Sequence, residues 1–158
     1  MASRAKVHKP STRKFSLKNI TIGIVVAQWH NDITGALLKG AIDSLKKSGI
    51  PSSSIIIKHV PGSFELPLGA QWLREHDNAD AVLCLGCIIQ GETPHFDYIS
   101  QAVANGIMAL NLKYNIPVIF GVLTTNTVKQ AKQRSGGKHG NKGADAAIAA
   151  LEMLELKK

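Results

Sequence analysis

The chain has 158 residues, of which 44% are hydrophobic, and it carries a formal net charge of +8 at pH 7. This length fits one domain, and the composition is that of a globular protein. No apolar run approaches the ~18 residues that a membrane span needs, and the first 19 residues lack the apolar core of a secretory signal. We therefore expect a basic flexible arm over residues 1–19 and a single domain over residues 20–158.

The positive charge is concentrated in this arm. No acidic residue precedes Asp32, whereas the first 14 residues alone supply five positive charges, from Arg4, Lys6, Lys9, Arg13 and Lys14. Such a segment is typical of a solvated tail, although it also suits contact with an anionic surface or cargo, or the remnant of a transit peptide. A nucleic-acid-binding protein would instead spread basic residues, with aromatic residues between them, over one face.

Apolar segments rich in β-branched residues alternate along the domain with segments of helical periodicity. The expected elements are strand 20–27, helix 31–48, strand 54–60, helix 64–76, strand 80–90, helix 94–114, strand 117–123, a short helix opened by Thr127, and a last helix from about 141. This alternation predicts βαβ units and a parallel sheet. Because the strands are nearly all apolar, helices should cover both faces of the sheet. The expected fold class is therefore α/β, a three-layer αβα sandwich around a four-stranded parallel sheet.

Cys84 and Cys87 have the Cys-x-x-Cys spacing of redox and metal sites. Both fall inside the expected strand 80–90, where side chains three positions apart point to opposite faces. Along the strand they would lie ~10 Å apart, which is too far for a disulfide. We therefore expect two inert buried thiols, which suit a reducing cytosol, and no metal site.

Residues that follow the strands are the candidates for ligand binding, because ligands of open parallel sheets bind beyond the carboxyl ends of the strands. The stretch Gly-Glu-Thr-Pro-His-Phe-Asp-Tyr (91–98) follows the third strand. We expect Thr93 to cap the next helix and Pro94 to open it, which leaves free backbone N–H groups suited to a phosphate. His95 can give and take protons near neutrality beside that anion. The alternative is an ordinary helix start with a surface histidine.

Residues 134–143 form a second notable stretch, which holds four glycines and the basic residues Arg134, Lys138 and Lys142. Glycines allow the backbone to approach a ligand closely, and an arginine can hold a phosphate through two parallel hydrogen bonds. The order of residues does not match a Walker phosphate-binding loop. A flexible basic linker is the alternative interpretation.

Two more side chains lie at predicted strand ends. Trp29 follows the first strand and can stack on a planar ring, although an aromatic residue at such a position is more often part of the core. Glu65 falls in the first turn of the second helix. Its carboxylate either offsets the helix dipole or accepts hydrogen bonds from sugar hydroxyls.

Four stretches together resemble the lumazine synthase family. They are Pro-Gly-Ser-Phe-Glu-Leu-Pro (61–67), Gly-Cys-Ile-Ile-Gln-Gly-Glu-Thr-Pro-His-Phe-Asp-Tyr (86–98), Phe-Gly-Val-Leu-Thr (120–124) and the glycine-rich stretch 134–143, in the family's order and spacing. The resemblance implies a flavodoxin-like fold and a cytoplasmic transferase without a cofactor. It also implies a pentameric ring with active sites between neighbouring subunits. The compact glycine turn further implies that rings assemble into an icosahedral capsid, and product could be handed over to riboflavin synthase.

The implied reaction is the penultimate step of riboflavin biosynthesis. It condenses 5-amino-6-(D-ribitylamino)uracil with 3,4-dihydroxy-2-butanone 4-phosphate to give 6,7-dimethyl-8-ribityllumazine, phosphate and water. Two other classes of function stay open from the residues alone. One is a non-catalytic flavin- or lumazine-binding protein on the same scaffold, which would not need His95 and Arg134 together. The other is a cage-forming or nucleic-acid-binding structural protein.

The resemblance also implies roles for individual residues of one subunit. Trp29 would stack on the uracil ring and His95 would transfer protons. The remaining residues would contact the ribityl chain, the pyrimidine ring or the phosphate, and they are Ser63, Phe64, Glu65, Cys87, Ile88, Ile89, Gly91, Glu92 and Thr93.

A neighbouring subunit would complete the site. Phe120 would supply a ring contact, Arg134 the phosphate clamp and Lys142 a polar contact to the pyrimidine. Asp145 occupies the position of an acid that assists His95. The sequence departs from the family at Gln90, where many members have Arg, so one positive charge fewer is expected at the mouth of the site.

Overall fold

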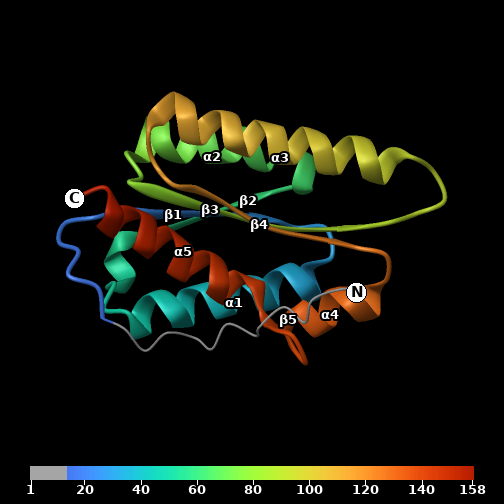
Figure 1. The fold of residues 1–158 in the computed structure, drawn as a ribbon, viewed down its shortest axis with the longest axis horizontal. Coiled ribbons are helices and arrows are strands. Elements are labelled where there is room, and N and C mark those ends of the chain that lie inside the picture. Colours follow the sequence, from blue (N-terminus) through green and yellow to red (C-terminus); the bar gives the residue numbers. More distant parts are fainter. Residues whose placement is uncertain (1–13) are drawn as a thin grey trace.

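A four-stranded parallel sheet in the order β2-β1-β3-β4 forms the centre of the molecule (Figure 1). The structure is a computed structural model that describes residues 14–158. The strands are β1 (Ile22–Ala27), β2 (Ile55–Val60), β3 (Ala81–Ile89) and β4 (Val118–Thr125). The central strand β1 is buried along its whole length and β3 along all but its last residue, as their continuous apolar sequences predict.

Helices cover both faces of this sheet, so the predicted three-layer, flavodoxin-like αβα sandwich is confirmed. The helices α2 (Leu66–Asp77) and α3 (His95–Tyr114) pack on one face, and α1 (Asn31–Lys47), α4 (Val128–Arg134) and α5 (Lys142–Leu156) pack on the other. The stripe predicted for the first helix is buried, and its members are Ile33, Leu37, Ala41 and Leu45. Fully burying such a side chain contributes ~1.5–3 kcal/mol.

Four short elements were not predicted. Single 3-10 turns precede β2 (Ser52–Ser54) and α2 (Ser63–Glu65). Between α4 and α5, the glycine-rich stretch forms an antiparallel hairpin of β5 (Ser135–Gly137) and β6 (Gly140–Asn141) rather than a plain turn. Gly136 and Gly140 have φ angles of 116° and 77°, which residues with a Cβ rarely adopt, so the glycines let the hairpin close.

Two predicted helix caps have different outcomes. The expectation that Thr93 caps α3 was wrong, because Pro94 takes the cap position and no side chain bonds to the first turn. The Pro94 carbonyl instead accepts hydrogen bonds from the N–H groups of Asp97 and Tyr98 at 3.0 and 3.3 Å. Thr127 does cap α4, since its hydroxyl accepts a hydrogen bond from the Gln130 N–H at 3.2 Å.

Part of the segment that the sequence assigned to the N-terminal arm lies against the domain. Phe15 is buried in the core cluster beneath α1 and α5, and Leu17 packs against the same cluster. The Phe15 N–H donates to the Ser48 carbonyl at 3.3 Å. Residues 1–13, which hold most of the basic charge expected of the arm, lie outside the described residues. Within the described part of the chain, no helix is long and apolar enough to cross a membrane.

Candidate active site

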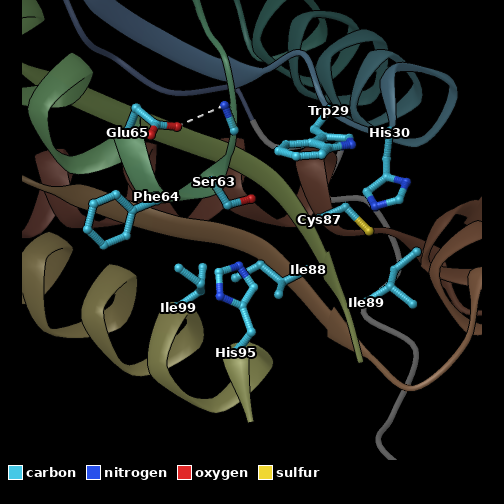
Figure 2. A pocket seen from close by; sticks show the side chains of 11 residues that line it. Trp29, His30, Ser63, Phe64, Glu65, Cys87, Ile88, Ile89, His95 and Ile99 are labelled. Carbon is cyan, nitrogen blue, oxygen red and sulfur yellow. Dashed lines mark hydrogen bonds between the residues drawn. The ribbon is translucent and has the colours of Figure 1, made fainter. Parts of the chain in front are cut away.

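A pocket of about 500 Å³ opens where the carboxyl ends of β1, β2 and β3 meet the start of α3. Figure 2 shows Trp29 and His30 on one side of it and His95 and Ile99 on the other. Because this is the carboxyl edge of the sheet, the pocket lies where the strand order predicts a ligand. Its lining residues are Trp29, His30, Gly62, Ser63, Phe64, Glu65, Cys87, Ile88, Ile89, His95 and Ile99.

Trp29 lies at the end of β1 and lines the pocket rather than the core. The N–H of Gln28 donates to the Val60 carbonyl at 2.8 Å, and the N–H of Trp29 donates to the Pro61 carbonyl at 3.1 Å. These bonds continue the pairing of β1 with the chain after β2, so the backbone of Trp29 is held at the pocket. Its side chain is 73% exposed, which excludes the core interpretation and leaves a ring face open to a planar ligand.

The loop between β2 and α2 forms the floor beside Trp29. One carboxylate oxygen of Glu65 accepts a hydrogen bond from the Gly62 N–H at 3.0 Å, so Glu65 shapes the loop that it belongs to. Ser63 is buried, and its hydroxyl finds no hydrogen-bond partner among the described residues. That hydroxyl packs over Gly86 so closely that a Cβ at Gly86 would lie 2.5 Å from it. An unpaired buried hydroxyl costs roughly 1–3 kcal/mol.

The end of β3 supplies three residues to the pocket wall, Cys87, Ile88 and Ile89. Cys84 and Cys87 pack into the cores on opposite faces of the sheet, and both are free thiols, as predicted. Burial raises the pKa of the Cys87 thiol to about 11, with a further contribution from the charge of Asp32. Burial raises the pKa of Cys84 further still. Among the described residues, no group of three or more His, Cys, Asp or Glu side chains could hold a metal ion.

His95 is the first residue of α3, and its imidazole lines the pocket opposite Trp29. The backbone N–H groups of the first turn of α3 begin at the same place, and a helix start carries positive partial charge that suits an anion. Gly91, Glu92 and Thr93 lie in the exposed loop between β3 and α3. They lie next to the pocket in sequence but are not part of its lining.

A second group of predicted residues lies along β4, the edge strand of the sheet. Phe120, Arg134, Lys142 and Asp145 line a depression of about 360 Å³ between this strand and the first turns of α5. The pairing of Ser135 with Asn141 in the hairpin brings the preceding Arg134 and the following Lys142 to one end of it. Lys142 donates to Asp145 at 2.9 Å, and Phe120 is 41% exposed.

The predicted site residues therefore form two separate groups in one chain. His95 and Trp29 lie in the pocket at the strand ends, whereas Arg134, Lys142 and Asp145 lie in the depression at the β4 edge. The two sets of lining residues have no member in common. A single chain thus has the stacking surface of Trp29 and the imidazole of His95 in the pocket, and the cations of Arg134 and Lys142 in the depression.

The comparison of the whole domain with known proteins identifies its family. The family profile described as 6,7-dimethyl-8-ribityllumazine synthase matches residues 19–158. The chain belongs to the 6,7-dimethyl-8-ribityllumazine synthase family. A relative of that name from Cytophaga hutchinsonii is 59% identical over 139 residues, covering 88% of this chain and 87% of the relative. Relatives of the same name from Porphyromonas gingivalis and Protochlamydia amoebophila are 52% and 46% identical, covering 89% and 90% of this chain and 88% and 83% of the relatives.

Sequence reasoning missed some of the residues that line the pocket of this 6,7-dimethyl-8-ribityllumazine synthase family member. His30, Gly62 and Ile99 belong to the lining but were not predicted. His30 has a left-handed backbone with φ of 59°, and its carbonyl accepts hydrogen bonds from the N–H groups of Ile33 and Thr34, both at 2.9 Å. The signal available was its place between a strand and a helix, since histidine tolerates this backbone conformation better than most residues.

Proposed function

We propose that this chain condenses 5-amino-6-(D-ribitylamino)uracil with 3,4-dihydroxy-2-butanone 4-phosphate at a site completed by a neighbouring copy of the chain. The activity is that of a transferase of riboflavin biosynthesis, and its product is 6,7-dimethyl-8-ribityllumazine. The observation that carries the shared site is the separation of His95 from Arg134 and Lys142 into two pockets of one chain.

The pocket at the strand ends suits the uracil substrate. The exposed indole of Trp29 offers a face on which the uracil ring stacks, and Cys87, Ile88 and Ile89 present a β3 edge to the pyrimidine. Ser63 and Glu65 meet the ribityl chain. A ribityl hydroxyl would give the unpaired Ser63 hydroxyl a partner and so remove the cost of burying it alone. The exposed ring of Phe64 forms the outer wall.

The phosphate of the second substrate binds where the start of α3 faces the neighbour's cations. Gly91, Glu92 and Thr93 form the loop around it, and the helix start supplies N–H groups. Arg134 of the neighbouring copy grips the phosphate with its guanidinium fork. Lys142 of the same copy contacts the pyrimidine and Phe120 contacts its ring.

The chemistry then proceeds through proton transfer, addition and elimination. The 5-amino group attacks the ketone and the adduct loses water to give an imine. Elimination of phosphate then leaves an enol that tautomerises to a second ketone. The ribityl-bearing nitrogen adds to this ketone, and loss of a second water completes the ring. His95 moves protons during these steps. The neighbour's Asp145 orients that imidazole and balances its positive charge when it is protonated. Holding both reactants in one pocket lowers the activation free energy by up to ~7–11 kcal/mol in well-oriented systems. Since no step needs redox or Lewis-acid chemistry, we propose no resident cofactor.

Exposed apolar side chains support self-assembly of the chain. Leu68 and Trp72 on α2, and Met108 and Leu112 on α3, are between 46% and 78% exposed. Apolar residues gathered on two adjacent helices are typical of a surface that another chain covers. We propose a closed pentameric ring, and the compact β5–β6 hairpin favours assembly of rings into an icosahedral capsid. Hand-over of product to riboflavin synthase and a cytoplasmic location belong to the same proposal.

The test of the activity is an assay with the two substrates, followed by the fluorescence of the lumazine product. The proposal predicts product that requires both substrates and purified protein, with one phosphate released for each lumazine formed. A chain that binds the product but forms none from the two substrates would be a non-catalytic lumazine-binding protein, and the proposal would be wrong.

A further inference from the structure

Asn141 is the last residue of the hairpin and stands directly before Lys142. Its side-chain oxygen accepts hydrogen bonds from the N–H groups of Gly143 and Ala144 at 2.8 and 3.2 Å, so it caps α5. Its side-chain nitrogen donates to the carbonyl of Ala36, inside α1, at 2.9 Å. One amide side chain thus fixes the start of α5 and ties it to another helix.

The backbone around this amide is packed without spare room. A Cβ at Gly40 of α1 would lie 2.4 Å from the Asn141 amide, and a Cβ at Gly143 would lie 1.9 Å from the carbonyl oxygen of Leu37. The glycines therefore let α1 and the start of α5 approach each other closely, and Asn141 fills the space between them. A side chain held at both ends in this way has one position.

The position of this amide determines where two cations lie. Asn141 pairs with Ser135 across the hairpin, and the residues next to this pair in the chain are Arg134 and Lys142. The guanidinium of Arg134 itself donates a hydrogen bond within its own helix, to the Gln130 carbonyl one turn earlier, at 3.1 Å. The bond from Asn141 to Ala36 thus connects the Arg134–Lys142 pair to the rigid α1 layer.

We propose that Asn141 is a positioning residue for the anion-binding half of the active site. It does not touch the substrate. It holds Arg134 at the place and in the direction that the phosphate of the neighbour's substrate requires, through its pairing with Ser135 and by clamping the start of α5 onto α1. This inference rests on the proposed function and deepens it.

The first variant is Asn141→Ser. Serine is a good helix cap and carries no charge, so α5 keeps its cap, but the side chain is too short to reach Ala36. The expected result is a KM for the butanone phosphate raised roughly tenfold, because a small misplacement of a binding group weakens the bond that it makes. The KM for the ribitylaminouracil should rise much less, because Lys142 is only one of several side chains that contact the pyrimidine. Inhibition by inorganic phosphate should weaken by a similar factor.

The chain offers a matched control in Asn111. Its side chain also makes three hydrogen bonds, to the Val118 N–H and to the carbonyls of Val118 and Ile107, at 2.7–2.9 Å, and these tie α3 to β4. Asn111→Ser should lower stability in urea at least as much as Asn141→Ser while leaving the phosphate KM within about twofold of the parent. Gly40→Ala should reproduce the Asn141→Ser kinetics, because it displaces the same amide from the α1 side.

The outcomes separate this inference from the function that it rests on. A parent chain that forms no product overturns the proposed function, and the positioning role falls with it. An active parent whose Asn141→Ser variant loses stability with unchanged KM values, or with both KM values raised equally, leaves the function standing and shows that Asn141 is a structural residue. A selective rise in the phosphate KM for both Asn141→Ser and Gly40→Ala, absent from Asn111→Ser, supports the inference.

Discussion

His95 is the residue on which proton transfer depends in this account. His95→Ala should lower kcat by ~10²–10⁴-fold, the usual contribution of a positioned acid–base group, and should leave the fold intact because the side chain is exposed. His76→Ala is the control, since His76 is exposed in the last turn of α2, away from the pocket. Steady-state assays with both substrates at saturation measure the effect. A kcat within about threefold of the parent would remove His95 from the chemistry.

The thiol of Cys87 should be unreactive although it lines the pocket. Its pKa is raised from an ordinary 9.0 to about 11, because the thiol is buried and Asp32 lies near it, so the reactive thiolate is scarce at pH 8. A thiol-specific disulfide reagent should modify the native protein only as fast as it unfolds, and the urea-unfolded protein at once. Two rapidly reacting thiols in the native state would indicate a redox pair and contradict the strand placement.

The same pKa shift gives a direction for the pH dependence of stability. The folded pKa of Cys87 lies above the ordinary value, so the folded state prefers the neutral thiol. Its contribution to stability is complete below about pH 9 and is lost as the pH rises toward 11, where the unfolded chain releases the proton first.

Most of the residues that line the pocket could be predicted because they follow strands. Trp29, Glu65 and His95 lie at or just after the carboxyl ends of three strands, which is where parallel sheets bind ligands. His30 was missed because the sequence pattern places it in a junction and says nothing about the direction of its side chain. That direction depends on a left-handed backbone at one residue.

At the scale of elements, the contact of α5 with α1 is the most constrained part of the structure. Gly143→Ala should destabilise the protein by at least the ~1–3 kcal/mol typical of overpacking, since the new Cβ would meet backbone rather than a movable side chain. Gly35→Ala is the matched control, because it lies in α1 with nothing within 4 Å of its Cβ.

Alanine is a better helix former than glycine, so Gly35→Ala should stabilise by ~0.5–1 kcal/mol. Urea unfolding followed by circular dichroism measures both variants. Equal and small effects at the two glycines would contradict the close approach of the helices.

The elements that could be predicted are those with long periodic sequences. The four main strands and the long helices followed from continuous apolar runs and buried stripes such as that of α1. The hairpin of β5 and β6 could not be predicted. Its five residues are Ser, Gly and Asn, which show no hydrophobic periodicity, and their pairing depends on packing against α1. The prediction of a Thr93 cap was wrong because α3 begins at His95, one residue later than expected, so Pro94 takes the cap position.

At the scale of the whole molecule, two exposed features of one chain indicate that it binds further copies of itself. They are the apolar residues on α2 and α3, and the pair of half-sites. Light scattering after size exclusion at physiological salt should therefore show no monomer, and a particle far larger than five chains if rings form a capsid. A single pentamer peak would remove the capsid and keep the shared site, whereas an active monomer of 16.9 kDa would remove both.

The shared active site is tested most directly by mixing two inactive variants within one assembly. His95→Ala damages one half-site and Arg134→Ala the other, so each variant alone should be inactive. Co-expressed in equal amounts and assembled at random, they should recover about a quarter of the parent's activity, because about one contact in four joins an intact His95 to an intact Arg134 of its neighbour. If each chain instead holds a complete site of its own, every chain in the mixture carries one lesion, and no activity above that of the two separate variants will return.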